Sequence, residues 1–121
     1  MNIKNIVDSQ KDFFETNQTL SYNFRKENLA KLRQAILNYQ TQLEDALFLD
    51  LGKNKYESYM TEIGFVLREL TFMEKHLKKL IKPQRVKSPI TDFPSKSYRI
   101  PHPSGNILII SPWNYPINLT L

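Results

Sequence analysis

A short and continuously apolar run, Ile107-Leu108-Ile109-Ile110, is the feature that most restricts the fold of this chain. The run is rich in β-branched residues and is introduced by Ser104-Gly105, so its pattern predicts a strand. Apolar side chains on both sides of a strand need cover on both faces, as in a parallel sheet flanked by helices. The run therefore predicts an α/β fold with neighbouring strands and a second layer of helices.

Two long stretches upstream carry apolar residues at the three- and four-residue spacing of amphipathic helices. The first extends from about Tyr22 to Asp50, with Gly52 placed as a left-handed C-cap. The second begins near Glu57, and Pro83 stops it. Because a short link over residues 52–54 joins the two, we expect an antiparallel helical hairpin.

The remaining segments of the chain show weaker patterns. A short first helix is expected after Asn2, a suitable N-cap, ending near residues 16–17. Residues 83–95 are broken by prolines and show no regular pattern. The SYRIPHP segment alternates and can form an edge strand, because Pro101 and Pro103 cannot donate to a central ladder. Residues 117–121 are expected to open a further helix.

Composition excludes several classes of function within these 121 residues. The chain has no cysteine, which excludes a disulfide framework, a thiolate nucleophile and a cysteine zinc site. The two histidines have no clustered acids near them, so no metal site is predicted. The N-terminal sequence fits no signal peptide, and no apolar run reaches the roughly 20 residues of a membrane span. We therefore expect a cytoplasmic protein with no membrane segment in this portion.

Charge is distributed unevenly along the chain. Residues 1–74 hold nine Lys or Arg against eleven Asp or Glu, whereas residues 75–121 hold eight against one. A nucleic-acid site would interleave these basic residues with base-stacking aromatics or place them on a recognition helix. Here the lysines crowd the end of a helix, where cations complement the negative end of the dipole, so no nucleic-acid partner is expected. The favoured interpretation is a solvated face or a surface that the rest of a larger protein contacts. The alternative is a helical interaction module whose basic region, residues 75–99, binds an anionic partner.

The segment Ser111-Pro112-Trp113-Asn114-Tyr115-Pro116 follows the predicted strand, where ligands bind in open α/β sheets. The two prolines stiffen the turn, and Pro116 suits the first position of a helix. The Asn114 amide offers uncharged N–H donors that could stabilise an oxyanion in a transition state. By residue type alone, Asn114 could equally cap the next helix or close the turn on its own backbone.

Three segments resemble the aldehyde dehydrogenase superfamily, and specifically its class 3-like branch. They are PSGNILIISPWNYPINLTL at residues 103–121, ALFLDLGK at 46–53 and ESYMTEI at 57–63. Their order and spacing agree with that branch, and the resemblance extends over nearly the whole chain. It implies oxidation of an aldehyde to a carboxylic acid with NAD or NADP, on a fold with a Rossmann-like cofactor domain.

The resemblance also implies roles for the residues of the turn. Asn114 would be the oxyanion donor, whereas Ser111, Pro112 and Trp113 would line the cofactor cleft and Tyr115 would approach the aldehyde. The strand containing His102, itself a structural residue, would correspond to the oligomerisation strands, which implies a homodimer. The cysteine nucleophile and glutamate base of the superfamily have no counterparts in these residues, so the segment cannot perform the chemistry alone. An inactive truncated relative is a further alternative.

The resemblance divides the chain into three parts. Residues 1–82 would be N-terminal helices that pack on the cofactor-binding domain. Residues 83–103 would be a crossing segment with the oligomerisation-type strand. Residues 104–121 would be the first strand and the helix start of an incomplete dinucleotide-binding domain. The expected fold class is thus α/β, with a helical hairpin leading into the first strands of a Rossmann-like fold and with this portion mostly α-helical.

Overall fold

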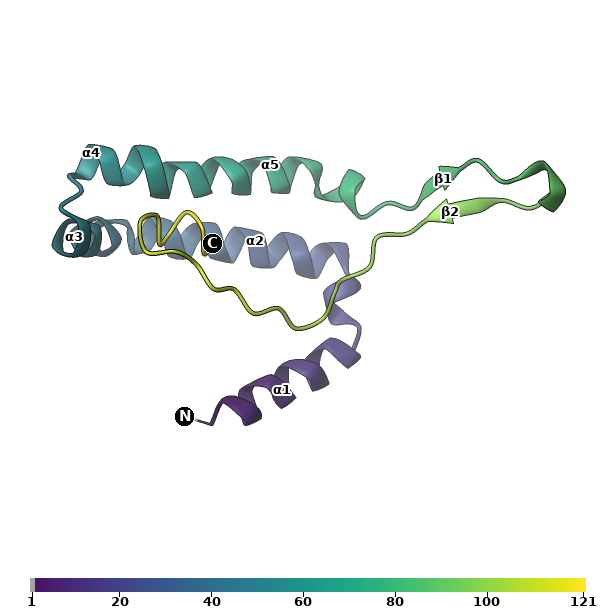
Figure 1. Ribbon diagram of the computed structural model, residues 1–121, viewed down its shortest axis with the longest axis horizontal. Helices are drawn as coiled ribbons and strands as arrows, with labels where there is room; N and C mark the ends of the chain where they lie inside the picture. Colours follow the sequence, from purple (N-terminus) through teal and green to yellow (C-terminus); the bar gives the residue numbers. More distant parts are fainter. Residues whose placement is uncertain (1) are drawn as a thin grey trace.

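The computed structural model describes residues 2–121, which are mostly helical, as expected. The elements in chain order are α1 (Ile3–Glu15), η1 (Gln18–Leu20), α2 (Tyr22–Asn38), α3 (Gln40–Leu51), α4 (Lys55–Ser58), η2 (Tyr59–Ile63), α5 (Gly64–Leu80), β1 (Gln84–Val86), η3 (Ile90–Asp92) and β2 (Ser97–Arg99). Figure 1 shows α2 and α5 side by side, a two-stranded ribbon projecting beyond α5, and α1 diverging from the rest. The C-terminal segment returns across α2 toward α3.

Local capping sets several helix ends where the sequence predicts them. The Asn2 side chain accepts a hydrogen bond of 3.0 Å from the Lys4 amide, and α1 ends at Glu15, as expected. Gly52 closes α3 with φ 67° and ψ 12°, which confirms the predicted left-handed C-cap. An added Cβ at Gly52 would meet no atom within 4 Å, so backbone conformation rather than space favours glycine there.

The prediction of one continuous helix from Tyr22 to Asp50 is wrong. The helix breaks at Tyr39, whose φ of −102° and ψ of 8° end α2 and begin α3. Figure 1 shows α3 nearly end-on, across the end of the α2 and α5 pair. In this direction Leu43 packs on the core and Leu47 is buried. Burial of these leucines, a tertiary effect, therefore decides the direction of residues 40–51.

The expected antiparallel hairpin forms between α2 and α5 (Figure 1). Its core consists of the buried residues Ile36, Ile63, Val66 and Leu70. An ion pair ties the two helices together at the surface, with 2.9 Å between Arg33 Nη2 and Glu74 Oε2. The link between the long helices is longer than predicted, because it includes α3 and the short α4, which starts at Lys55 rather than Glu57.

The segment η2 is a turn of π-helix, which joins α4 to α5. The Gly64 amide donates to the Tyr59 carbonyl, the five-residue spacing of such a turn. A Cβ on Gly64 would lie 2.8 Å from that carbonyl oxygen, so the wide turn requires glycine at this position. Within η2, Glu62 and Ile63 are both fully buried. The π-turn thus places a carboxylate inside the molecule beside a core residue.

Residues 83–95 are more regular than predicted. They contain β1, which pairs antiparallel with β2 so that Gln84 faces Arg99 and Val86 faces Ser97, and they also contain η3. The expected strand in SYRIPHP is confirmed over Ser97–Arg99. The sequence pattern missed β1 because pairing across the ribbon, not local alternation, makes this short segment extended.

The predicted strand over Ile107–Ile110 is not formed. Its four side chains are 72%, 83%, 58% and 85% exposed, and between residues 2 and 121 no strand pairs with it. A strand needs hydrogen bonds from a neighbour, and this portion supplies none. The predicted helix at Pro116 is also replaced by turns, although Leu119 N donates to Tyr115 O with helical spacing at 3.1 Å.

These exposed apolar side chains predict the behaviour of the isolated 121 residues. Because Ile107–Ile110 and Trp113 have no cover, the isolated chain should bind a hydrophobic dye and unfold over a broad temperature range. Differential scanning calorimetry and dye fluorescence on the purified chain would measure both. A sharp, cooperative transition of a monomer without dye binding would contradict this prediction.

Candidate functional site

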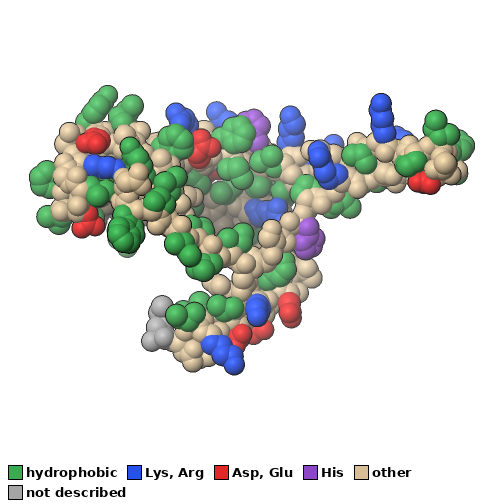
Figure 2. Space-filling view, viewed as in Figure 1, with side chains coloured by type: hydrophobic (Ala, Val, Ile, Leu, Met, Phe, Trp, Pro, Cys, Tyr) green, Lys and Arg blue, Asp and Glu red, His purple; other side chains and the backbone are tan. Residues whose placement is uncertain are grey.

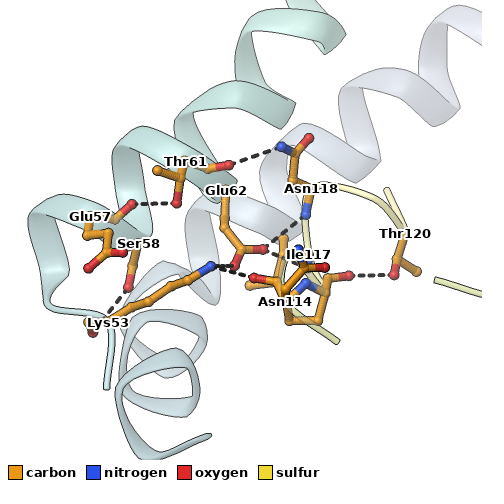
Figure 3. A network of polar contacts seen from close by, with 10 residues as sticks. Lys53, Glu57, Ser58, Thr61, Glu62, Asn114, Ile117, Asn118 and Thr120 are labelled. Carbon is orange, nitrogen blue, oxygen red and sulfur yellow. Dashed lines mark hydrogen bonds and ion pairs between the residues drawn. The ribbon is translucent and has the colours of Figure 1, made fainter. Parts of the chain in front are cut away.

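The turn over residues 111–116 lies against the junction of α3, α4 and η2, where a buried ion pair holds it (Figure 3). Lys53, in the link after α3, is 8% exposed, and its Nζ lies 2.6 Å from Glu62 Oε1. The same ammonium donates to the backbone carbonyl of Asn114 at 2.8 Å. One buried cation therefore joins the helical layer to the backbone of the residue predicted to be catalytic.

Glu62 supplies the second half of this attachment. Its side chain is fully buried, and its Oε2 accepts hydrogen bonds from the backbone amides of Ile117 at 2.9 Å and Asn118 at 3.2 Å. Together with Lys53, these donors satisfy both carboxylate oxygens, as a buried charge requires. Figure 3 shows the carboxylate between the lysine and the chain after the turn. Glu62 thus fixes the exit of the turn while Lys53 fixes its centre.

Further contacts hold the segment that follows the turn. Asn118 donates from its side-chain amide to the Thr61 carbonyl at 3.0 Å, and Ile117 packs on the hydrophobic core. The Thr120 hydroxyl donates to the Pro116 carbonyl and shares a hydrogen bond of 2.7 Å with the Ser111 hydroxyl. We call Lys53 and Glu62 the clamp, because they bind the backbone on both sides of Pro116.

The clamp leaves the side chain of Asn114 free. Asn114 is exposed, and its side-chain amide makes no hydrogen bond to any residue between 2 and 121. The structure therefore does not use this amide to cap a helix or close the turn, which were the alternatives at the sequence level. A held backbone with an unengaged amide is a geometry that can present N–H donors to an external group.

The other predicted site residues occupy different surroundings. Pro112 and Trp113 are exposed, Trp113 at 88%, and they form the outer face of the turn. Ser111 is half-buried with its hydroxyl bonded to Thr120. The Tyr115 ring lies over Lys53, with 4.1 Å from Nζ to the ring centroid, a cation–π geometry. Thus Asn114 and Tyr115 both meet Lys53, whereas Pro112 and Trp113 face outward.

Sequence reasoning assigned no role to the clamp. Glu62 did carry a detectable signal, because it lies in phase with the buried Val66 and Leu70 at four-residue spacing. A charged residue on the apolar face of a helix needs a buried partner, so this position pointed to an internal ion pair. Lys53 carried no comparable signal, since it lies in a link without periodicity.

The remaining features outside the turn have ordinary structural settings. The basic side chains of residues 75–99 lie along the end of α5 and the projecting ribbon (Figure 2). The His102 ring contacts the Phe14 ring edge-on at 6.4 Å between centroids, in keeping with the structural role expected for it. Between residues 2 and 121, no helix combines the length and the apolar character needed to cross a bilayer.

Known proteins resemble this chain throughout its length. The profile of the aldehyde dehydrogenase family matches residues 1–121. A 4,4'-diaponeurosporen-aldehyde dehydrogenase of Staphylococcus aureus is 48% identical over 109 residues, which cover 90% of this chain and 24% of the relative. Aldehyde dehydrogenase family 3 member B3 of Mus musculus is 37% identical, over 92% of this chain and 23% of that protein.

A solved structure agrees with these relatives. The substrate-bound state of Staphylococcus aureus AldH superposes with a TM-score of 0.91 at 46% identity, over 98% of this chain and 26% of that one. The chain thus spans about a quarter of the length of the relatives that it matches. The predicted resemblance and fold class are confirmed, and the chain belongs to the aldehyde dehydrogenase family.

Proposed function

We propose that these residues are the N-terminal portion of an NAD- or NADP-dependent enzyme that oxidises aldehydes to carboxylic acids. Family membership supports this reaction, and the relatives named above are dehydrogenases of aldehydes. The nucleophilic cysteine of such an enzyme has no counterpart among these residues, so this portion contributes to the site without completing it. Its contribution lies in the turn over residues 111–116.

Asn114 is the oxyanion donor in this proposal. The observation that carries the assignment is its exposed, unengaged amide on a backbone held by a buried lysine. When a nucleophile adds to an aldehyde, negative charge develops on the carbonyl oxygen. A fixed N–H donor stabilises that charge in the transition state more than the neutral carbonyl in the ground state. Asn114 thereby lowers the barrier without itself exchanging a proton.

The outer face of the turn is suited to contact part of a nicotinamide cofactor, which accepts a hydride when bound. Exposed Pro112 and Trp113 present apolar and aromatic surface on which a planar ring can lie. The Ser111 hydroxyl is already bonded to Thr120, so Ser111 contributes through its backbone. Tyr115 contributes to the aldehyde side of the turn, with one ring face occupied by Lys53.

The proposal extends to domains and partners. Residues 1–82 pack on the cofactor-binding domain, and residues 104–121 begin it. The ribbon of β1 and β2 within residues 83–103 projects with exposed apolar side chains, which suits pairing in a homodimer. The protein functions in the cytoplasm, with no nucleic acid as partner.

The first test is the intact mass of the polypeptide that carries these residues in its cells. A mass about four times that of this 14.3 kDa chain is expected, in line with the relatives. A mass equal to 14.3 kDa would overturn the proposal in favour of an inactive relative or an interaction module.

The second test is an assay of the purified whole polypeptide with NAD or NADP. Short aliphatic aldehydes, aromatic aldehydes and 4,4'-diaponeurosporen-aldehyde should be supplied separately, since the Staphylococcus aureus relative is named as a dehydrogenase of the last of these. Reduced cofactor and carboxylic acid should form in equal amounts. Absence of turnover with every class of aldehyde and both cofactors would contradict the proposed activity.

A further inference from the structure

We propose that Lys53 and Glu62 are positioning residues that set the placement of the Asn114 amide. This inference rests on the proposed role of Asn114 as oxyanion donor. Neither residue is exposed to a substrate, since Glu62 is fully buried and Lys53 is 8% exposed. Both therefore act through the turn and not on the reacting atoms.

The geometry gives each residue a separate part in the positioning. Lys53 binds the carbonyl of Asn114 itself at 2.8 Å, which fixes the peptide plane next to the Asn114 Cα. Glu62 holds Lys53 at 2.6 Å and also binds the amides of Ile117 and Asn118. Pro116 lies between these two anchor points and fixes φ, so the backbone from Asn114 to Asn118 has little freedom.

The buried pair of Lys53 and Glu62 positions the turn, and does not only stabilise the fold. A buried ion pair is weak support for stability, because the desolvation of two charges offsets their attraction. Here three of the hydrogen bonds of the pair end on the backbone of one short segment. Transition-state stabilisation depends steeply on position, since a misplacement near 1 Å can cost on the order of 10²-fold in rate. Control of position is the property that this pair provides.

The natural comparison within the chain is the pair of Arg33 and Glu74. Arg33 donates to Glu74 at 3.2 and 2.9 Å and to the Thr71 hydroxyl at 2.8 Å. This pair also joins distant parts of the sequence, but it joins α2 to α5 and has no hydrogen bond to the turn. The charge-neutral variant Arg33→Met with Glu74→Gln is therefore a control for loss of an ion pair as such.

The test is a double-mutant cycle on the whole polypeptide. One arm is the clamp variant, which carries both Lys53→Met and Glu62→Gln and leaves the net charge unchanged, and the other arm is Asn114→Ala. The clamp variant alone should lower kcat between about 10-fold and 10²-fold, with a smaller change in KM. In the Asn114→Ala background it should lower kcat no further, within about twofold, because the amide that it positions is gone. The Arg33 and Glu74 control should leave kcat within about twofold in either background.

Hydrogen exchange of residues 111–121 gives a readout independent of turnover. The amides of Ile117 and Asn118 should exchange faster in the clamp variant, because the substituted glutamine must accept from both amides without a lysine partner to hold it. Their exchange rates should be unchanged in the Arg33 and Glu74 control. If the double variant fails to fold, Glu62→Asp keeps the charge but withdraws the carboxylate by one methylene. It should show the same loss of kcat and the same absence of effect in the Asn114→Ala background.

The outcomes distinguish failure of the positioning role of Lys53 and Glu62 from failure of the oxyanion role of Asn114. If clamp and Asn114→Ala losses multiply, Lys53 and Glu62 act independently of Asn114, and the positioning role is overturned while the function stands. Unchanged exchange of the Ile117 and Asn118 amides would also overturn it. If Asn114→Ala alone leaves kcat unchanged, the oxyanion role fails first, and the positioning role fails with it.

Discussion

Replacement of Asn114 by alanine in the whole polypeptide is expected to lower kcat by about 10²- to 10³-fold, the usual cost of removing one preorganised oxyanion donor. The physical reason is that the lost N–H meets negative charge that exists in the transition state and not in the bound aldehyde. KM for the aldehyde and the affinity for NAD or NADP should change little, because the amide contributes little to ground-state binding.

Steady-state kinetics with saturating cofactor, together with cofactor titration by fluorescence, would measure these effects. A suitable control is Asn28→Ala, which removes another exposed amide that bonds the Phe24 carbonyl in α2, far along the chain from the turn. It should retain normal turnover. Near-normal kcat for Asn114→Ala would refute the oxyanion assignment, whereas equal loss in the Asn28 variant would indicate a general effect of destabilisation.

Replacement of Glu62 by alanine should destabilise the whole polypeptide by about 3–5 kcal/mol, the range for removing one partner of a buried ion pair. The change leaves the Lys53 ammonium without its carboxylate at 8% exposure and leaves the Ile117 and Asn118 amides without their acceptor. The two amides then bear the cost of desolvation without a compensating hydrogen bond, and the ammonium keeps only its hydrogen bond to the Asn114 carbonyl, with no opposite charge beside it.

Chemical denaturation followed by circular dichroism would measure the loss. The matched control is Glu69→Ala, which removes an exposed glutamate from α5 and should change the free energy of unfolding by no more than about 0.5 kcal/mol. Lys53→Met with Glu62→Gln should lose less than Glu62→Ala, because no unpaired charge is left inside and the substituted glutamine can still accept a hydrogen bond. Equal stability of Glu62→Ala and Glu69→Ala would show that the buried pair is not required for folding.

Local patterns predicted much of the helical portion. The apolar spacing indicated the helices, and Gly52 was identified as a left-handed C-cap. The antiparallel pairing of two amphipathic segments was also predicted, although the connection between them is longer than expected. The candidate turn was also recognisable, because its two prolines and its Trp-Asn pair stand together in the sequence. These features depend on residues within a few positions of each other, which the sequence displays directly.

Other features depend on partners that local patterns do not reveal. The break at Tyr39 follows from the packing of Leu43, and β1 is extended because it pairs with β2. The apolar run at 107–110 shows the reverse case, since strong strand propensity forms no strand without a neighbour to hydrogen-bond. In each case a contact outside the segment decides its conformation.

The sequence by itself determined the family, the helices and the position of Asn114 in a stiff turn. The tertiary structure alone decided what holds that turn, because Lys53 is 61 residues from Asn114 and Glu62 is 55 residues from Ile117. Burial made the difference, since a carboxylate and an ammonium removed from water must find partners, and here those partners include the backbone on both sides of Pro116.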